Sequence, residues 1–247
     1  MRRAVLALFL TAAAAGTAAA QWQLPENLPP EEYGTLLIDR TATPNKVAPA
    51  VFSHHVHRRK HTCRVCHFEV EFNFKVNTTE ITEAGNKGGR FCGTAGCHDG
   101  KAVFGHDEPN CGRCHRESRK ADKKDIDALA ALPRNRFGNK VNWVKALERG
   151  DIKPATHLTL PQADMTFDKR LVLEANWNNI PMAVFPHREH VAWLDCNNCH
   201  PDIFNIKKKT TKHFAMTRIL QGEFCGVCHL TVAFPMDDCK RCHPKKL

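Results

Sequence analysis

The sequence lacks several features, and each absence narrows the class of protein. After residue 20 it has no apolar run near the ~20 residues that a membrane-spanning helix needs, so we expect no span in the mature chain. No cysteine precedes Cys63, which excludes a lipid-anchored cysteine at an N-terminal cleavage site. Tyrosine occurs only once, as Tyr33, and no histidine precedes His54. These absences favour a soluble protein whose chemistry is concentrated after residue 50.

The first twenty residues have the composition of an export signal. Arg2 and Arg3 form a short positive start, an apolar stretch follows, and small residues lead up to Ala20. This order matches the three regions of a secretory signal peptide. A membrane anchor is the alternative, but the apolar run is too short to span a bilayer. We therefore predict that residues 1–20 are cleaved and that the mature protein is periplasmic or extracellular.

The cysteines are abundant and follow one pattern. An exported chain with 12 cysteines would ordinarily suggest disulfides, and short cysteine pairs also bind zinc, but neither use requires a histidine directly after every pair. The pattern Cys-x-x-Cys-His is the attachment signal of c-type haem, in which both thiols bond to the haem and the histidine binds its iron. We predict six covalently bound haem c groups, at Cys63/Cys66/His67, Cys92/Cys97/His98, Cys111/Cys114/His115, Cys196/Cys199/His200, Cys225/Cys228/His229 and Cys239/Cys242/His243.

The second pair departs from the common spacing, because four residues separate Cys92 from Cys97. Two of the four, Gly93 and Gly96, are glycines, which adopt backbone conformations closed to other residues. The longer loop can therefore bulge while both thiols still reach one haem, and we expect a haem here as well.

Two stretches of the chain repeat each other. FSHHVHRRKHTCRVCH, from Phe52, and FPHREHVAWLDCNNCH, from Phe185, share a histidine pair at equal distance from a haem motif. The likeness continues in FNFKVNTT and FNIKKKTT, and in a Gly-x-Phe-Cys segment before the second pair of each half. We infer a tandem duplication of a three-haem unit. The predicted organisation is a signal peptide (1–20), an extended N-terminal arm (21–51), unit 1 (52–120), a wrapping linker with short helices (121–184) and unit 2 (185–247).

Regular secondary structure is predicted to be sparse. Apolar residues at helical spacing predict a helix within 120–132 and a second within 141–149, which Gly150 closes. Short helices are expected at the Cys-His motifs, with a two-stranded ribbon near 68–74 and another near 201–206. The fold class is thus mostly irregular and helical with few short strands. We also expect the chain not to fold without haem, since folding and cofactor binding are coupled.

These motifs resemble the class III multihaem cytochromes c, and specifically a tandem of the triheme, cytochrome c7-type unit. The resemblance is carried by Phe-x-His-x-x-His before Cys-x-x-Cys-His at Phe52 and Phe185, by GEFCGVCH, and by FGNKVNWVKALERGDIKP from Phe137. It implies the multihaem cytochrome c fold, mostly bis-histidine iron and electron transfer. It also implies four distal ligands: His54 opposite His67, His57 opposite His98, His187 opposite His200 and His190 opposite His229.

The distal ligand of the third haem in each unit stays open. In unit 2 the nearest histidine is His213, and Met216 competes with it. In unit 1 no histidine or methionine lies between Glu80 and Arg90. There we favour His106 and then His61, with His55 and His157 as further candidates and a missing protein ligand as the last possibility.

The formal net charge of +10 does not indicate nucleic acid here, because the propionates of bound haems would offset it. The leading hypothesis is an electron carrier without catalytic residues, in a respiratory chain of anaerobic or metal-reducing type. Its partners would be redox proteins: a quinol oxidoreductase, other cytochromes or a terminal reductase. The alternative is a multihaem oxidoreductase that acts on a small nitrogen or sulfur compound at an open iron, although no Cys-x-x-Cys-Lys variant occurs. An oligomer or haem filament is a third hypothesis.

Overall fold

The computed structural model describes residues 24–26, 28–161, 167–175, 180–207 and 210–245. Turns and irregular backbone connect short elements, and within these residues the longest helix has eight residues. This confirms the predicted class of mostly irregular and helical structure with few strands. A search of the same residues finds no helix with the length and apolarity needed to cross a membrane.

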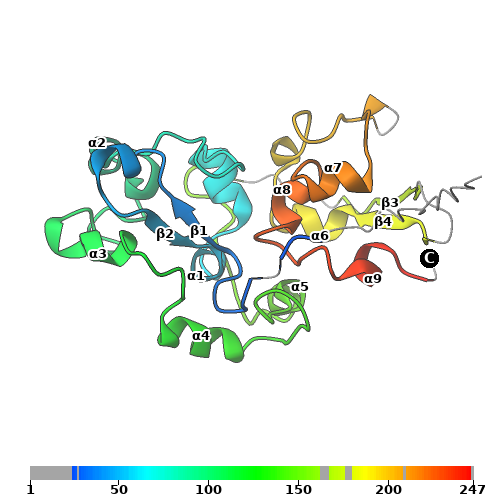
Figure 1. The fold of residues 1–247 in the computed structure, drawn as a ribbon, viewed down its shortest axis with the longest axis horizontal. Coiled ribbons are helices and arrows are strands. Elements are labelled where there is room, and N and C mark those ends of the chain that lie inside the picture. Colours follow the sequence, from blue (N-terminus) through cyan, green and yellow to red (C-terminus); the bar gives the residue numbers. More distant parts are fainter. Residues whose placement is uncertain (1–23, 27, 162–166, 176–179, 208–209, 246–247) are drawn as a thin grey trace, which may run out of the picture.

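The elements fall into two groups that follow the repeat, with the linker between them. Figure 1 shows the first group on the left, the second on the right, and the linker helices α4 and α5 below. The first group is β1 (Thr35–Ile38), η1 (Thr43–Asn45), β2 (Ala50–Ser53), α1 (His54–Arg58), η2 (Val65–Glu69), α2 (Glu83–Lys87), η3 (Phe91–Gly93), η4 (Glu108–Asn110) and α3 (Cys111–Cys114). The linker holds α4 (Lys123–Ala130), α5 (Trp143–Glu148) and β3 (Arg170–Leu173). The second group is β4 (Ala183–Pro186), α6 (His187–Val191), η5 (Cys196–Asn198), α7 (Met216–Leu220), α8 (Gly226–His229) and α9 (Cys239–Cys242).

In each half of the chain an antiparallel ribbon runs directly into the helix of the paired histidines, and in the second half the first strand of the ribbon comes from the linker. Strand β1 pairs with β2 so that Leu36 faces Phe52, and β3 pairs with β4 so that Leu171 faces Phe185. The second strand of each ribbon ends where α1 or α6 begins. Strand β1 lies in the segment expected as an extended arm, and it pairs with the first residues of the repeat.

The ribbons predicted near 68–74 and 201–206 are wrong. The first segment ends η2, a π-helical turn, and continues without pairing, while the second consists of turns and bends. The alternating apolar residues from Phe68 to Phe74 predicted a strand, but the backbone of this segment forms a hydrogen bond with His67 in place of strand pairing. The carbonyl oxygen of Phe72 accepts a hydrogen bond from Nδ1 of His67 at 2.7 Å, and the ring of Phe74 stacks on that histidine at 4.3 Å.

A small apolar core joins the linker to unit 2. It consists of Leu129, Leu132, Val141, Ala146, Ile152 and Trp193. Both predicted linker helices are present, and α4 supplies Leu129 while α5 supplies Ala146; the linker backbone beside them supplies Leu132, Val141 and Ile152. The side chain of Asn142 caps α5 by accepting a hydrogen bond from the backbone of Lys145, and Gly150 ends it with a φ of 70°.

A buried ion-pair network fixes unit 1 against the linker and unit 2. Arg64 donates to Glu69 at 2.6 Å and to Asp195 at 3.2 Å. The side chains of Arg64 and Glu69 are each only 3% exposed. Glu69 also accepts hydrogen bonds from the backbone of residues 158–160. The network therefore positions the first haem motif of unit 1, which contains Arg64, beside the first motif of unit 2.

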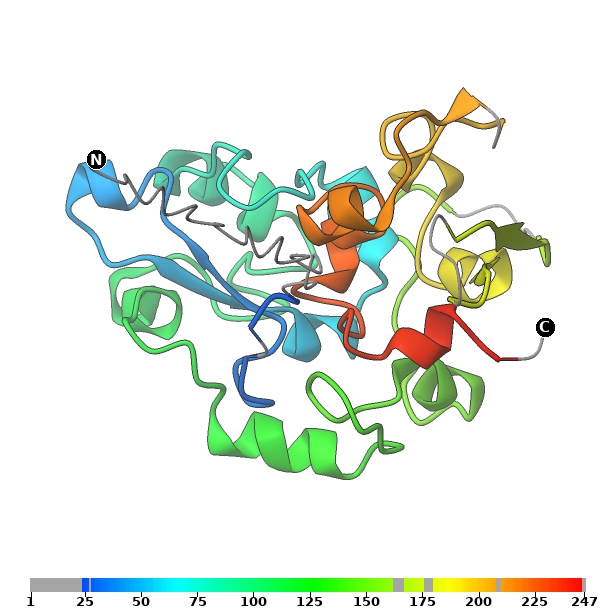
Figure 2. The same ribbon diagram turned by 45° about the vertical axis from the view of Figure 1, so that its right-hand side comes forward.

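The C-terminal segment returns to the first half of the chain. In Figure 2 the segment after α8 passes α1 and approaches α5 before α9 begins. The hydroxyl of Tyr33 donates to the carbonyl oxygen of Ala233 at 2.6 Å. Gly138 lies so close to Tyr33 and Pro235 that an added Cβ would come within 3.1 Å of the tyrosine ring and 3.3 Å of the proline. The N-terminal arm, the linker and the C-terminal segment thus meet at one point.

Candidate haem-binding sites

The cysteine pairs share one local geometry. All twelve cysteines lie in described residues, and none forms a disulfide. In five motifs the histidine backbone N–H donates to the carbonyl oxygen of the first cysteine at 2.8–3.0 Å: His98 to Cys92, His115 to Cys111, His200 to Cys196, His229 to Cys225 and His243 to Cys239. This bond closes the loop that carries both thiols and brings the histidine beneath them. The longer loop after Cys92 closes in the same way, so its extra residues do not displace His98.

Ten histidines share a second feature, a hydrogen bond from Nδ1 to a backbone carbonyl oxygen. For the predicted proximal ligands the acceptors are Phe72 for His67, Phe104 for His98, Ala48 for His115, Phe204 for His200, Phe234 for His229 and Pro181 for His243. For the predicted distal ligands they are Gly34 for His54, Ser53 for His57, Lys169 for His187 and Pro186 for His190. Histidines that bind metals are usually held in this way, because the bond sets the tautomer and leaves Nε2 for the metal.

For five of these histidines, His54, His57, His67, His190 and His229, burial lowers the pKa and so favours the neutral ring that metal binding requires. It lowers the pKa of His54 to about 3 and that of His229 to about 4. It also lowers the pKa of His57 and of His190. A neutral ring with its Nδ1 proton on a carbonyl group presents a lone pair at Nε2, which is the donor that haem iron takes.

Two of the predicted ligand pairs face each other at the distance that one iron requires. The ring centroids of His57 and His98 are 6.1 Å apart, and those of His190 and His229 are 6.2 Å apart. Two metal–nitrogen bonds of about 2 Å each would place opposed imidazole centroids about 6 Å apart. For the first pair of unit 1, His67 lies close enough to lower the pKa of the buried His54. The residues therefore fit haem c, and the pairing of His187 with His200 stays a prediction.

One phenylalanine in each unit orients both histidines of the pair. Phe52 stacks on His57 at 4.4 Å and meets His54 edge-on at 4.8 Å. Phe185 makes the same contacts with His190, at 4.3 Å, and with His187, at 4.8 Å. The sequence showed both residues as the start of the repeat, and the structure adds their role against the histidine rings.

Sequence reasoning missed the residues whose carbonyl groups receive the Nδ1 protons. Four of these acceptors are phenylalanines that follow a haem motif: Phe72, Phe104, Phe204 and Phe234. A signal was present, because all four occur in the segments that repeat between the units. The sequence pattern shows only that each phenylalanine recurs, and not that its backbone carbonyl group accepts the hydrogen bond from the histidine.

The candidates for the third haem of unit 1 are spread over several places. Nε2 of His106 is buried without a hydrogen-bond partner, and its ring lies 6.4 Å from that of His98. Nδ1 of His61 is likewise buried without a partner. His55 is buried against the hydroxyl of Ser53, and Nδ1 of His157 lies 3.1 Å from the Thr156 hydroxyl.

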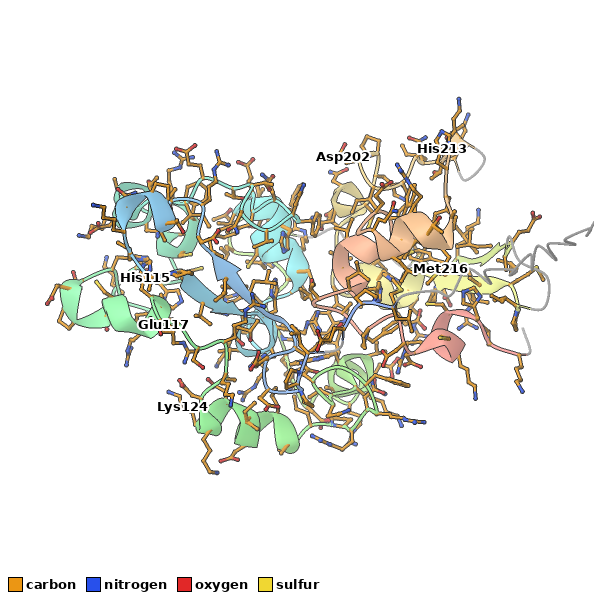
Figure 3. The ribbon with its side chains drawn as sticks, viewed as in Figure 1. His115, Glu117, Lys124, Asp202, His213 and Met216 are labelled. Carbon is orange, nitrogen blue, oxygen red and sulfur yellow. The ribbon has the colours of Figure 1, made fainter. Side chains whose placement is uncertain are left out.

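The two candidates of unit 2 lie apart. Figure 3 shows His213 at the end of the uppermost loop of unit 2, with Met216 below it at the start of α7, nearer to α9. The backbone of His213 has a φ of 58°, which is rare for a residue other than glycine. This geometry favours Met216 as the ligand of the last haem, while His213 stays a prediction.

The thiols also show which haem sites are neighbours, because one thiol affects the pKa of another only over a short distance. Burial raises the pKa of Cys92 to about 12, and Cys114 adds to this rise. Burial also raises the pKa of Cys66 to about 12, and Cys97 adds to that rise. The third, second and first sites of unit 1 are therefore successive neighbours.

Two thiols of unit 2 show in the same way which of its sites lie next to unit 1. Burial raises the pKa of Cys228 to about 12, with further contributions from Cys63 and Cys199. Burial also raises the pKa of Cys225 to about 12, and Cys242 contributes next. The first site of unit 1 thus borders the first two sites of unit 2, and the third site of unit 2 lies beyond them.

Comparisons with known proteins identify the family. The family model described as "Cytochrome c7 and related cytochrome c" matches residues 50–116 and 183–244, which is more than half of the chain. Among solved structures, the C-terminal hexahaem fragment of GSU1996 is 26% identical, with a TM-score of 0.27, and the match covers 87% of this chain and 98% of that one. The dodecahaem cytochrome c GSU1996 is 24% identical, with a TM-score of 0.27, and the match covers 81% and 72%. A comparison with curated proteins found no match.

The predicted resemblance is confirmed by the two matched regions, each of which contains one histidine pair and three cysteine pairs. A protein of this kind binds haem c, and its family is one of electron-transfer proteins. The chain therefore belongs to the cytochrome c7 family of multihaem c-type cytochromes and carries two of its haem-binding units in tandem.

Proposed function

We propose that the protein is a hexahaem cytochrome that carries electrons between redox partners in the periplasm or at the cell exterior. When bound, haem c supplies reversible one-electron chemistry at its iron. The chain holds the six groups through its twelve cysteines and the six histidines that follow them. Support comes above all from the opposed rings of His57 and His98 and of His190 and His229. An iron with two histidine ligands exchanges electrons but has no place for a substrate.

We assign His54, His57, His187 and His190 as distal ligands, because each donates its Nδ1 proton to a backbone carbonyl group and follows the same ribbon. His54 and His57 extend from one turn of α1, and His187 and His190 from one turn of α6. Each helix therefore serves two haems, which holds the first and second haem of a unit close together.

The neighbouring thiols suggest an order for the electron path. It runs from the third site of unit 1 through the second to the first, crosses to the first two sites of unit 2, and ends at the third site of unit 2. The outermost sites include Cys111 and Cys239, both of which are exposed. Redox partners would dock near α3 and α9, and they would be a quinol oxidoreductase, another cytochrome or a terminal reductase.

The test begins with the exported protein. We expect its mass to exceed that of the mature polypeptide by six haems, and we expect dithionite to produce the absorption bands of reduced c-type cytochrome. The oxidised protein should show predominantly low-spin ferric iron by electron paramagnetic resonance. A colourless product would overturn the proposal, and a product with five haems would remove the site at Cys92 and Cys97. Rapid turnover of nitrite or sulfite with a reduced mediator would favour the oxidoreductase hypothesis instead.

A further inference from the structure

Helices α2 and α7 occupy the same place in their units. Glu83 begins α2 nine residues before Cys92, and Met216 begins α7 nine residues before Cys225. Two residues after each helix comes a glycine with positive φ, and two residues later a phenylalanine that also has positive φ: Gly89 at 79° and Phe91 at 49°, and Gly222 at 89° and Phe224 at 51°. The duplication therefore places Glu83 in unit 1 where Met216 stands in unit 2.

The packing of the two helices supports this correspondence. The glycine after the first cysteine lies directly against the preceding helix in both units. A Cβ added to Gly93 would lie 1.8 Å from the carbonyl oxygen of Asn86, and one added to Gly226 would lie 1.9 Å from that of Ile219. Only glycine permits this approach, so in both units the helix packs equally closely against the second haem motif.

Glu83 begins the helix α2, which in unit 1 corresponds to α7. Its pKa is lowered mainly by Lys87, with smaller effects of His106 and of His115, the proximal histidine of that site. By the correspondence of α2 and α7, Met216 faces the third site of unit 2. A methionine thioether is an established axial ligand of haem iron, so Met216 can close the coordination of that iron.

Unit 1 has a solvated ion pair where unit 2 has the thioether. The ammonium of Lys87 lies 2.6 Å from the carboxylate of Glu83, and their side chains are 55% and 76% exposed. Glu83 raises the pKa of Lys87, so the ammonium keeps its proton and has no lone pair for a metal. The carboxylate of Glu83 is already occupied by that ammonium. Neither side chain therefore replaces the methionine as an iron ligand.

His106 is the favoured one of the four candidate histidines of unit 1, and its ring lies close to the second site. It lies 6.4 Å from the ring of His98 at an interplanar angle of 67°. Its counterpart in unit 2 is Met236, since Phe104-Gly-His106-Asp107 matches Phe234-Pro-Met236-Asp237. The position of His106 is therefore distinct from the one that Met216 occupies.

We propose that the third haem site of unit 1, at Cys111, Cys114 and His115, binds a small exogenous ligand, because Glu83, which is paired with Lys87, stands where unit 2 has the thioether of Met216. The proposal rests on the proposed function, since it needs a haem at that site. The ligand class is small anions and neutral molecules that bind haem iron. Unit 2 has no such site.

The test is a cyanide titration of the oxidised holoprotein whose haem content has first been measured. We expect one high-spin ferric centre per chain, which cyanide converts to low spin, while the other centres do not respond. In Glu83→Met that centre should disappear, and the absorption band of methionine-ligated ferric haem should increase. The matched variant, Met216→Glu, should add a second cyanide-binding centre. Both changes are read by absorption and electron paramagnetic resonance, independently of any activity.

A protein with six haems, all low-spin and unresponsive to cyanide, would overturn this proposal and leave the hexahaem cytochrome intact. His106→Ala decides the role of the histidine: an unchanged cyanide-binding centre supports the open site, and a centre that appears only in this variant would show that His106 is the ligand. A haem content below six would instead overturn the proposed function, and peptide mapping would show which site is missing. The titration of the unmodified protein decides the question even if a variant fails to fold.

Discussion

Unit 1 and unit 2 hold their paired histidines in the same way. In each, a short ribbon runs into a helix whose two histidines donate their Nδ1 protons to carbonyl groups, and one phenylalanine contacts both rings. The opposed rings of the second site differ by only 0.1 Å between the units, at 6.1 and 6.2 Å. The proposed third sites differ, because α2 begins with Glu83 where α7 begins with Met216. The histidines of the ribbon and helix are thus retained in both copies, while the first residue of the separate helix varies.

A second difference lies in the surroundings of the two units. His55 in α1 is only 1% exposed, whereas the matching residue of α6 is the charged Arg188. Arg64, inside the first motif of unit 1, forms the buried ion pairs that reach Asp195, and its counterpart in unit 2 is Asn197. The copies are therefore not interchangeable, because the arginine of the ion pair between the units comes from unit 1 and the aspartate comes from unit 2.

The largest effect is expected from a variant that breaks the buried ion pairs between the two units. In Arg64→Met, Glu69 and Asp195 lose their cation, and removal of one partner from a buried ion pair typically costs about 3–5 kcal/mol. We expect a loss of this size in the free energy of unfolding, measured by denaturant titration of the holoprotein. Arg40→Met is the control, because its pair with Glu80 is exposed and such pairs contribute about 0–1 kcal/mol. Equal losses in both variants would contradict the proposed role of the network.

The next effect tests whether one helix serves two haems. His190→Ala should convert the haem at Cys225 and Cys228 from low to high spin, because the ring opposite His229 is lost. His57→Ala should do the same at Cys92 and Cys97. Assigned nuclear magnetic resonance signals of the haem methyl groups would locate each change.

The control for these variants is Arg188→Ala, since this residue lies in α6 beside His187 and is exposed. It should leave every haem signal unchanged. If His190→Ala instead perturbs only the haem at Cys196 and Cys199, the distal assignment of His190 is wrong.

The smallest effect concerns the point where the arm meets the C-terminal segment. Tyr33→Phe removes the hydrogen bond to the carbonyl of Ala233 but keeps the ring against Gly138. One hydrogen bond contributes about 1 kcal/mol net, so thermal unfolding should show a loss of about that size. The segment LPPEEYG, which contains Tyr33, resembles LPRNRFG, which ends at Gly138 and has Phe137 at the matching position. The aromatic ring alone is therefore compatible with this motif. An unchanged stability would show that the hydroxyl does not hold the two segments together.

Much of the haem-binding apparatus could be predicted from sequence. The two linker helices were also predictable, since their apolar spacing is local. The ribbons were not, because Phe68 to Phe74 has the alternation of a strand while its backbone is used by His67. The true ribbons lie before each histidine pair, where β1 and β3 pair with segments up to 18 residues away.

The amino-acid sequence by itself determined where haem attaches and that the unit is duplicated, because covalent attachment requires two thiols and a histidine at fixed, short spacing. Only the tertiary structure decided that a backbone carbonyl group holds each of these histidines and which haem sites are neighbours. The neighbouring sites depend on contacts between residues that are far apart along the chain. Arg64 and Asp195 illustrate this: 131 positions separate them, and no local pattern indicates that they meet.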